Sequence, residues 1–284
     1  MLHLDAATVL LQWSVGGLAF LWVTTSRREV GIGYGWLLRS VFALMALGSL
    51  IVGLRFHTVP VREVASVAVV IACAVALVVS WQRRKAGVMY QREQVQARSA
   101  RVSEMTGIDR DEQRFDDDVP EFPAWLDLVA PGVGLIGLIA AGISAGSPGW
   151  LQLARVIIGA AFLGCVTDAM LLGHWYLTQP GLPRAPLLQL VRQLAIIWPF
   201  EVAALLVPTG MISVIDGRIA DGYHGMLAWF WVACAITTIT LCGVTRAALK
   251  ERQYAAVMAA TGLLYLAILT AFGTDLVARA LLAS

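Results

Sequence analysis

Residues 61–81, VREVASVAVVIACAVALVVSW, decide the class of this protein. From Val64 to Gln82, nineteen consecutive residues carry no charge. At 1.5 Å of rise per residue, a helix of this length reaches about 29 Å, which matches the hydrocarbon thickness of a bilayer. This segment is therefore predicted to cross a membrane as a helix.

The composition extends this reading to the whole chain. Of the 284 residues, 58% are hydrophobic and only 14% are charged, and the mean hydropathy is +0.73. Soluble domains carry about 25% charged residues. A soluble protein of this length would need surface charges that the chain does not have. The net charge of +2 is also too small to indicate nucleic-acid binding.

Hydropathy over a window of about 19 residues predicts eight transmembrane helices and an all-α bundle. The predicted spans are 7–24, 36–56, 61–81, 124–145, 149–178, 185–208, 224–246 and 253–280. The chain then divides into residues 1–81 with three spans, one long loop at 82–123, and residues 124–284 with five spans. The loop begins with good helix formers, so we expect it to prolong the third helix before it becomes acidic.

The distribution of basic residues predicts an orientation. If both termini lie outside, sixteen of the 21 basic residues face the cytoplasm and five do not. The positive-inside rule favours this arrangement, with the 82–123 loop in the cytoplasm and both termini periplasmic or extracellular. Arginine is much commoner than lysine, beside abundant alanine, valine and glycine. We read this bias as a GC-rich bacterial genome, so a multi-pass protein of a bacterial plasma membrane is expected.

Residues 167–180, TDAMLLGHWYLTQP, place ionisable groups inside a predicted span. Counted from the cytoplasmic end, His174 lies about 6 Å deep and Asp168 about 15 Å deep. On the next span Arg192 lies about 10 Å deep. The short connection makes the two spans antiparallel neighbours, so an ion pair between Asp168 and Arg192 is predicted. Charged groups at such depth are costly and mark functional sites by default.

Two further polar residues complete the candidate site. Gln193 shares a polar stripe with Arg192, whereas Glu201 lies about 180° from Arg192 on an ideal helix, with Pro199 between them. Glu201 is the best single candidate for a carboxyl that gains and loses a proton. His174 could pass protons to the cytoplasm or hydrogen-bond a quinone. The predicted ligand or proton site thus comprises Asp168, His174, Arg192, Gln193 and Glu201.

Three functions fit this pattern. The first is a membrane protein that moves a proton or a small polar solute through a site between the fifth and sixth spans. The second is a non-catalytic membrane subunit of a redox complex that contacts a quinone or haem b. The third is a structural or assembly partner in which Asp168 and Arg192 clamp two helices. No nucleophile or paired carboxylates stand at workable spacing, so no catalytic centre of its own is expected.

Histidines at the external ends of spans give a weaker signal. His57 and His224 could converge on a metal, or could hold a haem from facing helices. Termini of different helices can also lie far apart, so no metal site is predicted. The expected partners are the lipid bilayer and further membrane or peripheral subunits.

Overall fold

The computed structural model describes residues 5–87, 93, 119–146, 148–179, 182–207, 210–251 and 253–283. Within these residues the chain is all helical, and eight helices are long and apolar enough to cross a membrane. They are α1 (Ala6–Thr25), α2 (Ile32–Arg55), α3 (Pro60–Gln82), α5 (Val129–Ser144, preceded by the 3-10 helix η2, Ala124–Leu128), α6 (Gly149–Thr178), α7 (Ala185–Leu206), α9 (Met226–Lys250) and α10 (Tyr254–Ala283). Eight helices able to span a membrane were predicted and eight are found among the described residues, and no bound is displaced by more than four residues when η2 is counted with α5.

Two details differ from the predicted pattern. A short helix, α8 (Met211–Ile215), lies between α7 and α9, and its five residues are too few for a hydropathy window to register. The helix α3 ends at Gln82 and is followed by the 3-10 helix η1 (Arg84–Ala86) and by Gly87, whose φ is 66°. Apart from Glu93, the predicted helical extension beyond Gly87 lies outside the described residues.

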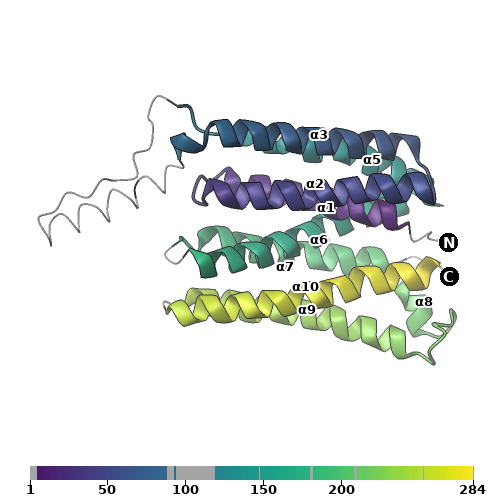
Figure 1. Cartoon of the computed structure of the whole chain (residues 1–284). Coiled ribbons are helices and arrows are strands. Elements are labelled where there is room, and N and C mark those ends of the chain that lie inside the picture. The colour runs from purple at the N-terminus through teal and green to yellow at the C-terminus, as the bar shows by residue number, and fades with distance from the viewer. Residues whose placement is uncertain are drawn as a thin grey trace, which may run out of the picture.

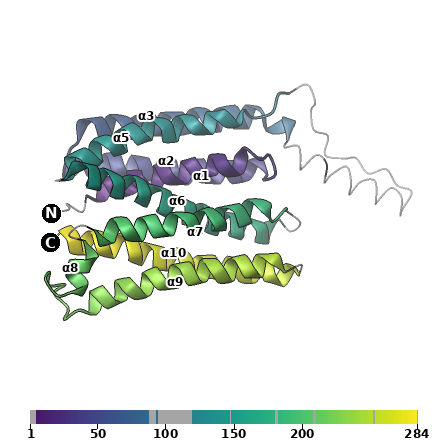
Figure 2. The same cartoon turned by 180° about the vertical axis from the view of Figure 1, so that it is seen from behind.

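The helices form two bundles of four. The first bundle consists of α1, α2, α3 and α5, and the second consists of α6, α7, α9 and α10 (Figure 1). In each bundle consecutive helices contact one another, and the first helix also contacts the fourth. Figure 2 shows the same grouping from behind, with both chain termini at one end of the molecule. The two halves of the chain therefore repeat one up-and-down arrangement.

Small residues allow the two bundles to approach closely where α1 crosses α6. A Cβ on Gly164 would lie 2.6 Å from the Cα of Gly16, and a Cβ on Gly16 would overlap the carbonyl oxygen of Ala160. Close backbone contact of this kind is typical of membrane helices with small residues at the crossing. Beside it, the Trp13 Nε1–H donates a hydrogen bond of 2.7 Å to the Thr167 hydroxyl. We call this contact the bundle interface.

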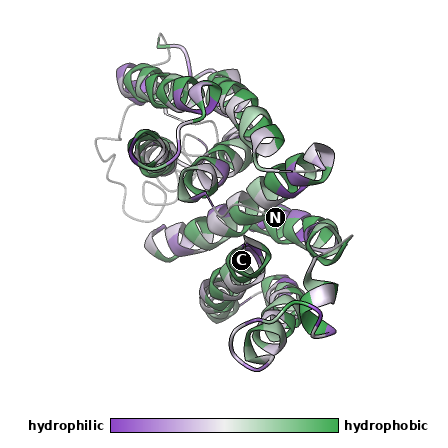
Figure 3. Ribbon diagram, turned by 90° about the vertical axis from the view of Figure 1, so that its right-hand side faces the viewer, coloured by the Kyte–Doolittle hydropathy of each residue, from purple (hydrophilic) through white to green (hydrophobic). Residues whose placement is uncertain are grey.

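Large apolar side chains cover the outward faces of the helices. On α2, for example, Leu44 and Ile51 are 67% and 60% exposed. Seen from the end that carries both termini, the helices are coloured predominantly hydrophobic on their sides (Figure 3). Apolar surface on this scale is not found on soluble monomers. The fold is that of a multi-pass membrane protein, and its apolar outer faces are compatible with lipid contact.

The start of α9 is capped from the preceding loop. The Asp221 carboxylate accepts hydrogen bonds from the backbone N–H groups of Gly225 and Tyr223, each at 2.9 Å, and from that of Leu227 at 2.9 Å. These donors, with Gly225 contributing most, lower the pKa of Asp221 below its ordinary value of 3.8. The helix α9 thus begins at an anionic cap outside the predicted membrane-spanning segment.

Candidate functional site

The predicted ion pair between Asp168 and Arg192 is wrong. Asp168 is fully buried on α6, and in the described part of the chain neither of its carboxyl oxygens has a hydrogen-bond partner. Arg192 is exposed on α7. The buried stripe of α7 consists of Leu187, Leu190, Val191 and Leu194. This apolar stripe turns toward the core, so it leaves Arg192 on the outer face although its depth resembles that of Asp168.

Asp168 instead lies beside the first bundle. The Tyr34 hydroxyl of α2 donates a hydrogen bond of 3.3 Å to the backbone oxygen of Asp168, and Tyr34 is itself fully buried. The Asp168 carboxyl therefore lies in a closely packed interior, with no hydrogen-bond donor among the described residues. Burial of an unpaired acid costs free energy, so packing alone gives no reason for an acid at this position.

His174 and Gln193 do not join Asp168 in one site. His174 is exposed on α6, and its Nδ1 lies 3.0 Å from the hydroxyl oxygen of Tyr265 on α10. Gln193 is half-buried, and its side-chain oxygen has no partner among the residues that the structure describes. Of the five predicted site residues, only Asp168 and Glu201 are fully buried, and they belong to different surroundings.

The structure also keeps the two candidate histidines on separate elements. His57 follows α2 and is exposed, with its Nδ1 4.0 Å from an Asp5 carboxylate oxygen. His224 is exposed in the loop between α8 and α9, whereas α2 and α3 lie at the opposite side of the molecule (Figure 1). Within the described ranges, no group of three or more His, Cys, Asp or Glu side chains is arranged to hold a metal ion.

Glu201 belongs to a buried polar cluster that joins α6, α7 and α10. Its carboxyl faces Asp275 and Arg279 of α10 and Arg155 of α6, and none of the four residues is more than 4% exposed. The Arg279 Nε–H donates a hydrogen bond of 2.7 Å to Asp275, and its Nη2 donates one of 2.9 Å to the backbone oxygen of Arg155. Arg155 in turn donates through Nε to the Ala204 backbone oxygen at 2.8 Å.

Two carboxyls of this cluster face each other. Neither oxygen of Glu201, nor Oδ2 of Asp275, accepts a hydrogen bond from a donor in the described residues. The two carboxyls interact with each other, so a hydrogen bond between them can form once one is protonated. Two ionised carboxylates in such an arrangement repel each other, so the pair is suited to hold one shared proton. We call Glu201 and Asp275 the carboxyl pair.

The first bundle also reaches this cluster, through Gln12 of α1. In the amide orientation that satisfies both of its ends, the Gln12 oxygen accepts from Arg279 Nη2 at 3.0 Å and from the Ala160 backbone N–H at 3.2 Å. Gly159 makes room for this contact, because a Cβ there would lie 2.5 Å from Arg279 Nη2. Counted along the helices, Glu201 lies about 8 Å, and Gln12 about 9 Å, from the end that carries the termini.

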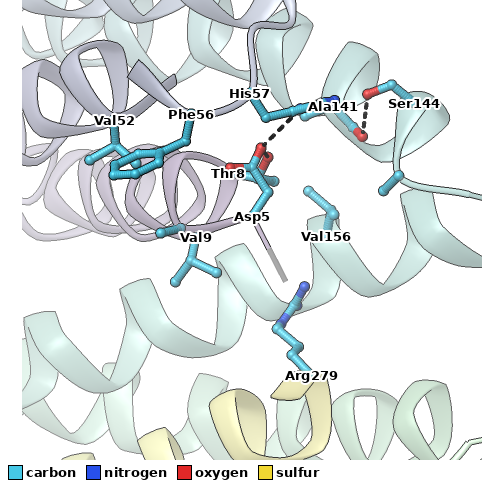
Figure 4. A pocket seen from close by; sticks show the side chains of 12 residues that line it. Asp5, Thr8, Val9, Val52, Phe56, His57, Ala141, Ser144, Val156 and Arg279 are labelled. Atoms are coloured by element: carbon cyan, nitrogen blue, oxygen red, sulfur yellow. Dashed lines mark hydrogen bonds and ion pairs between the residues drawn. The ribbon is translucent and has the colours of Figure 1, made fainter. Parts of the chain in front are cut away.

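A cavity of about 610 Å³ opens beside the cluster, where the two bundles meet. Helices α1, α2, α5, α6 and α10 all contribute to its lining. Figure 4 shows Arg279 reaching from α10 into this space, with Asp5 on its far side. The Arg279 Nη1 has no hydrogen-bond partner in the described ranges. We call this space the interface cavity.

The other buried arginines hold helices together. Arg62 on α3 is fully buried and binds the Asp5 carboxylate, the Thr8 hydroxyl at 3.0 Å and the adjacent Glu63 carboxylate. At the opposite end of the first bundle, Arg39 of α2 makes two hydrogen bonds of 2.7 and 2.8 Å to Asp127 of η2. Each of these guanidinium groups forms an ion pair with an acidic partner, so both arginines have a structural role.

Sequence reasoning missed most of the cluster. Arg155 and Arg279 are two of the five basic residues predicted on the external side, and the sequence predicted no further role for them and none for Asp275. One signal was present, because Asp275 and Arg279 stand four residues apart in a hydrophobic span and therefore share a helix face. Their meeting with Glu201 depends on how α7 packs against α10, which no local pattern encodes.

Comparison of the chain with known protein families, with curated proteins and with solved structures finds no match. The fold defines a polytopic α-helical membrane protein. The buried acids and the interface cavity are therefore the features of the chain that bear on its function.

Proposed function

We propose that this protein moves protons, alone or together with a small solute, across the membrane, and that the carboxyl pair is its proton-binding site. The observation that carries the proposal is the Glu201 carboxyl, which is buried against a second carboxyl and has no hydrogen-bond donor among the described residues. The guanidinium groups of Arg155 and Arg279 face Glu201, but they donate their hydrogen bonds to Asp275 and to backbone oxygens. Because a buried acid without a hydrogen-bond donor destabilises the fold, Glu201 is better explained by function.

The location of the site supports the same function. Transporters built from two repeated bundles commonly bind their substrates at the interface between the repeats. The interface cavity lies where the first and second bundles meet, and the carboxyl pair lies beside it within the second bundle, joined to it by Arg279. With the predicted orientation, the cavity opens on the external side of a bacterial plasma membrane, so protons enter the carboxyl pair from outside.

Asp168 provides the second step of the proposed path. It is the other fully buried acid whose two carboxyl oxygens both lack a donor among the described residues, and it lies about 15 Å from the cytoplasmic end of α6. His174 stands nearer that end and contacts Tyr265, but its side chain is exposed, so we do not assign it to the path. Arg192 is exposed, so we assign neither it nor its neighbour Gln193 to the path.

Proton flux into vesicles tests the proposal. The purified protein is reconstituted into liposomes that enclose a pH-sensitive dye, and a potassium gradient with valinomycin drives proton entry. Glu201→Gln keeps the shape of the side chain and removes its titration, so we expect it to abolish the flux. Asp216→Asn is the control, because Asp216 is exposed at the C-cap of α8, away from the cavity. Wild-type flux no greater than that of protein-free vesicles, or full flux in Glu201→Gln, would reject the proposal.

A further inference from the structure

We infer that the interface cavity binds an anionic amphiphile, an apolar body that carries one carboxylate, sulfonate or phosphate group, with its charge on Arg279. This inference rests on the proposed function, since it names the class of solute that accompanies the proton. It is carried by the lining of the cavity, by the unused donor of Arg279 and by the charge of the cluster.

The walls of the cavity suit an apolar body. Val9 of α1, Val52 and Phe56 of α2, Ala141 of α5 and Val156 of α6 all line it. The volume of about 610 Å³ lies within the range of pockets that enclose small organic ligands. A small inorganic ion would leave this apolar surface uncovered.

Arg279 provides an anchor for the charged group. The residue is only 4% exposed, and its Nε and Nη2 are held by Asp275 and by a backbone oxygen. Its Nη1 has no acceptor within the described part of the chain, and the guanidinium points into the cavity (Figure 4). A buried guanidinium with a free N–H is the usual partner of carboxylate and phosphate groups. Asp5 also borders the cavity, and it shares the single positive charge of Arg62 with Glu63, so we place the anionic group at Arg279 and away from Asp5.

The charge of the cluster links the anion to the proton. The charged groups that face Glu201 are Asp275 and Arg279 from α10 and Arg155 from α6. When the carboxyl pair holds one proton, two guanidinium groups face a single carboxylate, and the site has a net charge of +1. An anion on Arg279 neutralises this charge, whereas a neutral ligand does not. Anion and proton therefore favour each other's binding, and together they enter without net charge.

Equilibrium binding of decanesulfonate to the wild-type protein in lipid nanodiscs tests this inference by calorimetry. The sulfonate stays ionised at every pH used, so any pH dependence comes from the protein. We expect one site per chain, with an affinity about tenfold higher at pH 5 than at pH 8, a coupling of ordinary size between two sites. Decanol and decyltrimethylammonium, which match the apolar body but not the charge, should bind at least about tenfold more weakly. Inorganic sulfate should not compete, because it lacks the apolar body.

Variants separate the cavity from other sites. Val9→Trp fills the cavity and should abolish sulfonate binding, whereas Leu44→Trp on the lipid-facing side of α2 should leave it unchanged. Glu201→Gln should bind the sulfonate at both pH values with nearly equal affinity. Arg279→Gln should also abolish sulfonate binding, but it leaves Asp275 unpaired and can prevent folding. If Arg279→Gln does not fold, Val9→Trp alone tests whether the sulfonate binds in the cavity.

Three results would overturn the inference: no saturable binding to the wild type, unchanged binding in Val9→Trp, or decanol binding as tightly as the sulfonate. The last result would identify a site for a neutral ligand such as a quinone. Sulfonate binding without proton flux would leave the inference intact and reject the proposed function. Proton flux without sulfonate binding would support the proposed function and reject the inference.

Discussion

Gly164→Ala is predicted to weaken the bundle interface. The added methyl group would lie 2.6 Å from the Cα of Gly16 and closer still to the neighbouring backbone atoms of α1. Nonbonded carbon atoms prefer about 3.5–4.0 Å, so α1 and α6 must separate by about 1 Å. A flexible side chain cannot absorb this clash, because the atoms in contact belong to the backbone.

The cost follows from the kind of clash. Overpacking a closely packed site costs about 1–3 kcal/mol and more where the backbone must move. We expect a loss of about 3 kcal/mol, since the displaced helices join the two bundles. For a chain of this size the loss corresponds to a melting temperature lower by about 6–12 °C.

The buried thiols provide the assay. Cys73, Cys165, Cys234 and Cys242 are free and buried, so a dye that fluoresces on reaction with thiols reports unfolding in detergent. The matched control is Gly262→Ala on α10, where an added Cβ meets nothing within 4 Å. If Gly164→Ala melts within about 2 °C of this control, the described packing of the bundle interface is refuted.

The remaining predictions concern single charged groups. Asp127→Ala leaves Arg39 buried without its partner and should cost about 3–5 kcal/mol in the same melting assay; replacing both residues by apolar ones should restore most of that stability. Asp168→Leu, which puts an apolar side chain of similar shape in its place, should stabilise the protein by about 1–3 kcal/mol, because it removes an unsatisfied carboxyl, yet it should abolish proton flux. A double-mutant cycle between Asp168 and Arg192 should give a coupling energy within about 0.5 kcal/mol of zero, and a clear coupling would restore the rejected ion pair. The folded-state pKa of Asp221 is lowered, so its cap contributes full stability above the unfolded value and loses it as the pH falls through the folded value. Asp221→Asn should remove that part of the pH dependence of melting as the pH falls below about 5, and an unchanged profile would show that the cap does not contribute.

The transmembrane helices could be predicted from the sequence because the membrane constrains each span by itself, whatever it packs against. A span such as α3 must be about 20 residues long, apolar and helical, and all three properties are visible in residues 61–81. The short helix α8 escapes the same reasoning because its five residues are too few to form a span.

The site was accessible only in part. Glu201 was identified from its depth and chemistry, and it is buried in a polar cluster. Its partner Asp275 comes from the last helix, and only the packing of α7 against α10 brings the two together. Arg192 lies at a depth similar to that of Asp168, but its side chain points away from Asp168, so the predicted ion pair does not form. The apolar stripe of α7, which contains Leu190 and Leu194, fixes that direction.

Difference infrared spectroscopy of the reconstituted protein addresses the shared proton itself. The C=O stretching band of a protonated carboxyl is separate from the bands of a carboxylate, so a titration followed in this region reports where protons are held. A band that appears as the pH is lowered from 8 to 5, and that is missing in Glu201→Gln but present in Asp216→Asn, is the predicted result. An identical band pattern in wild type and Glu201→Gln over that range would contradict it, and the two acids would then be no more than a buried feature of the fold.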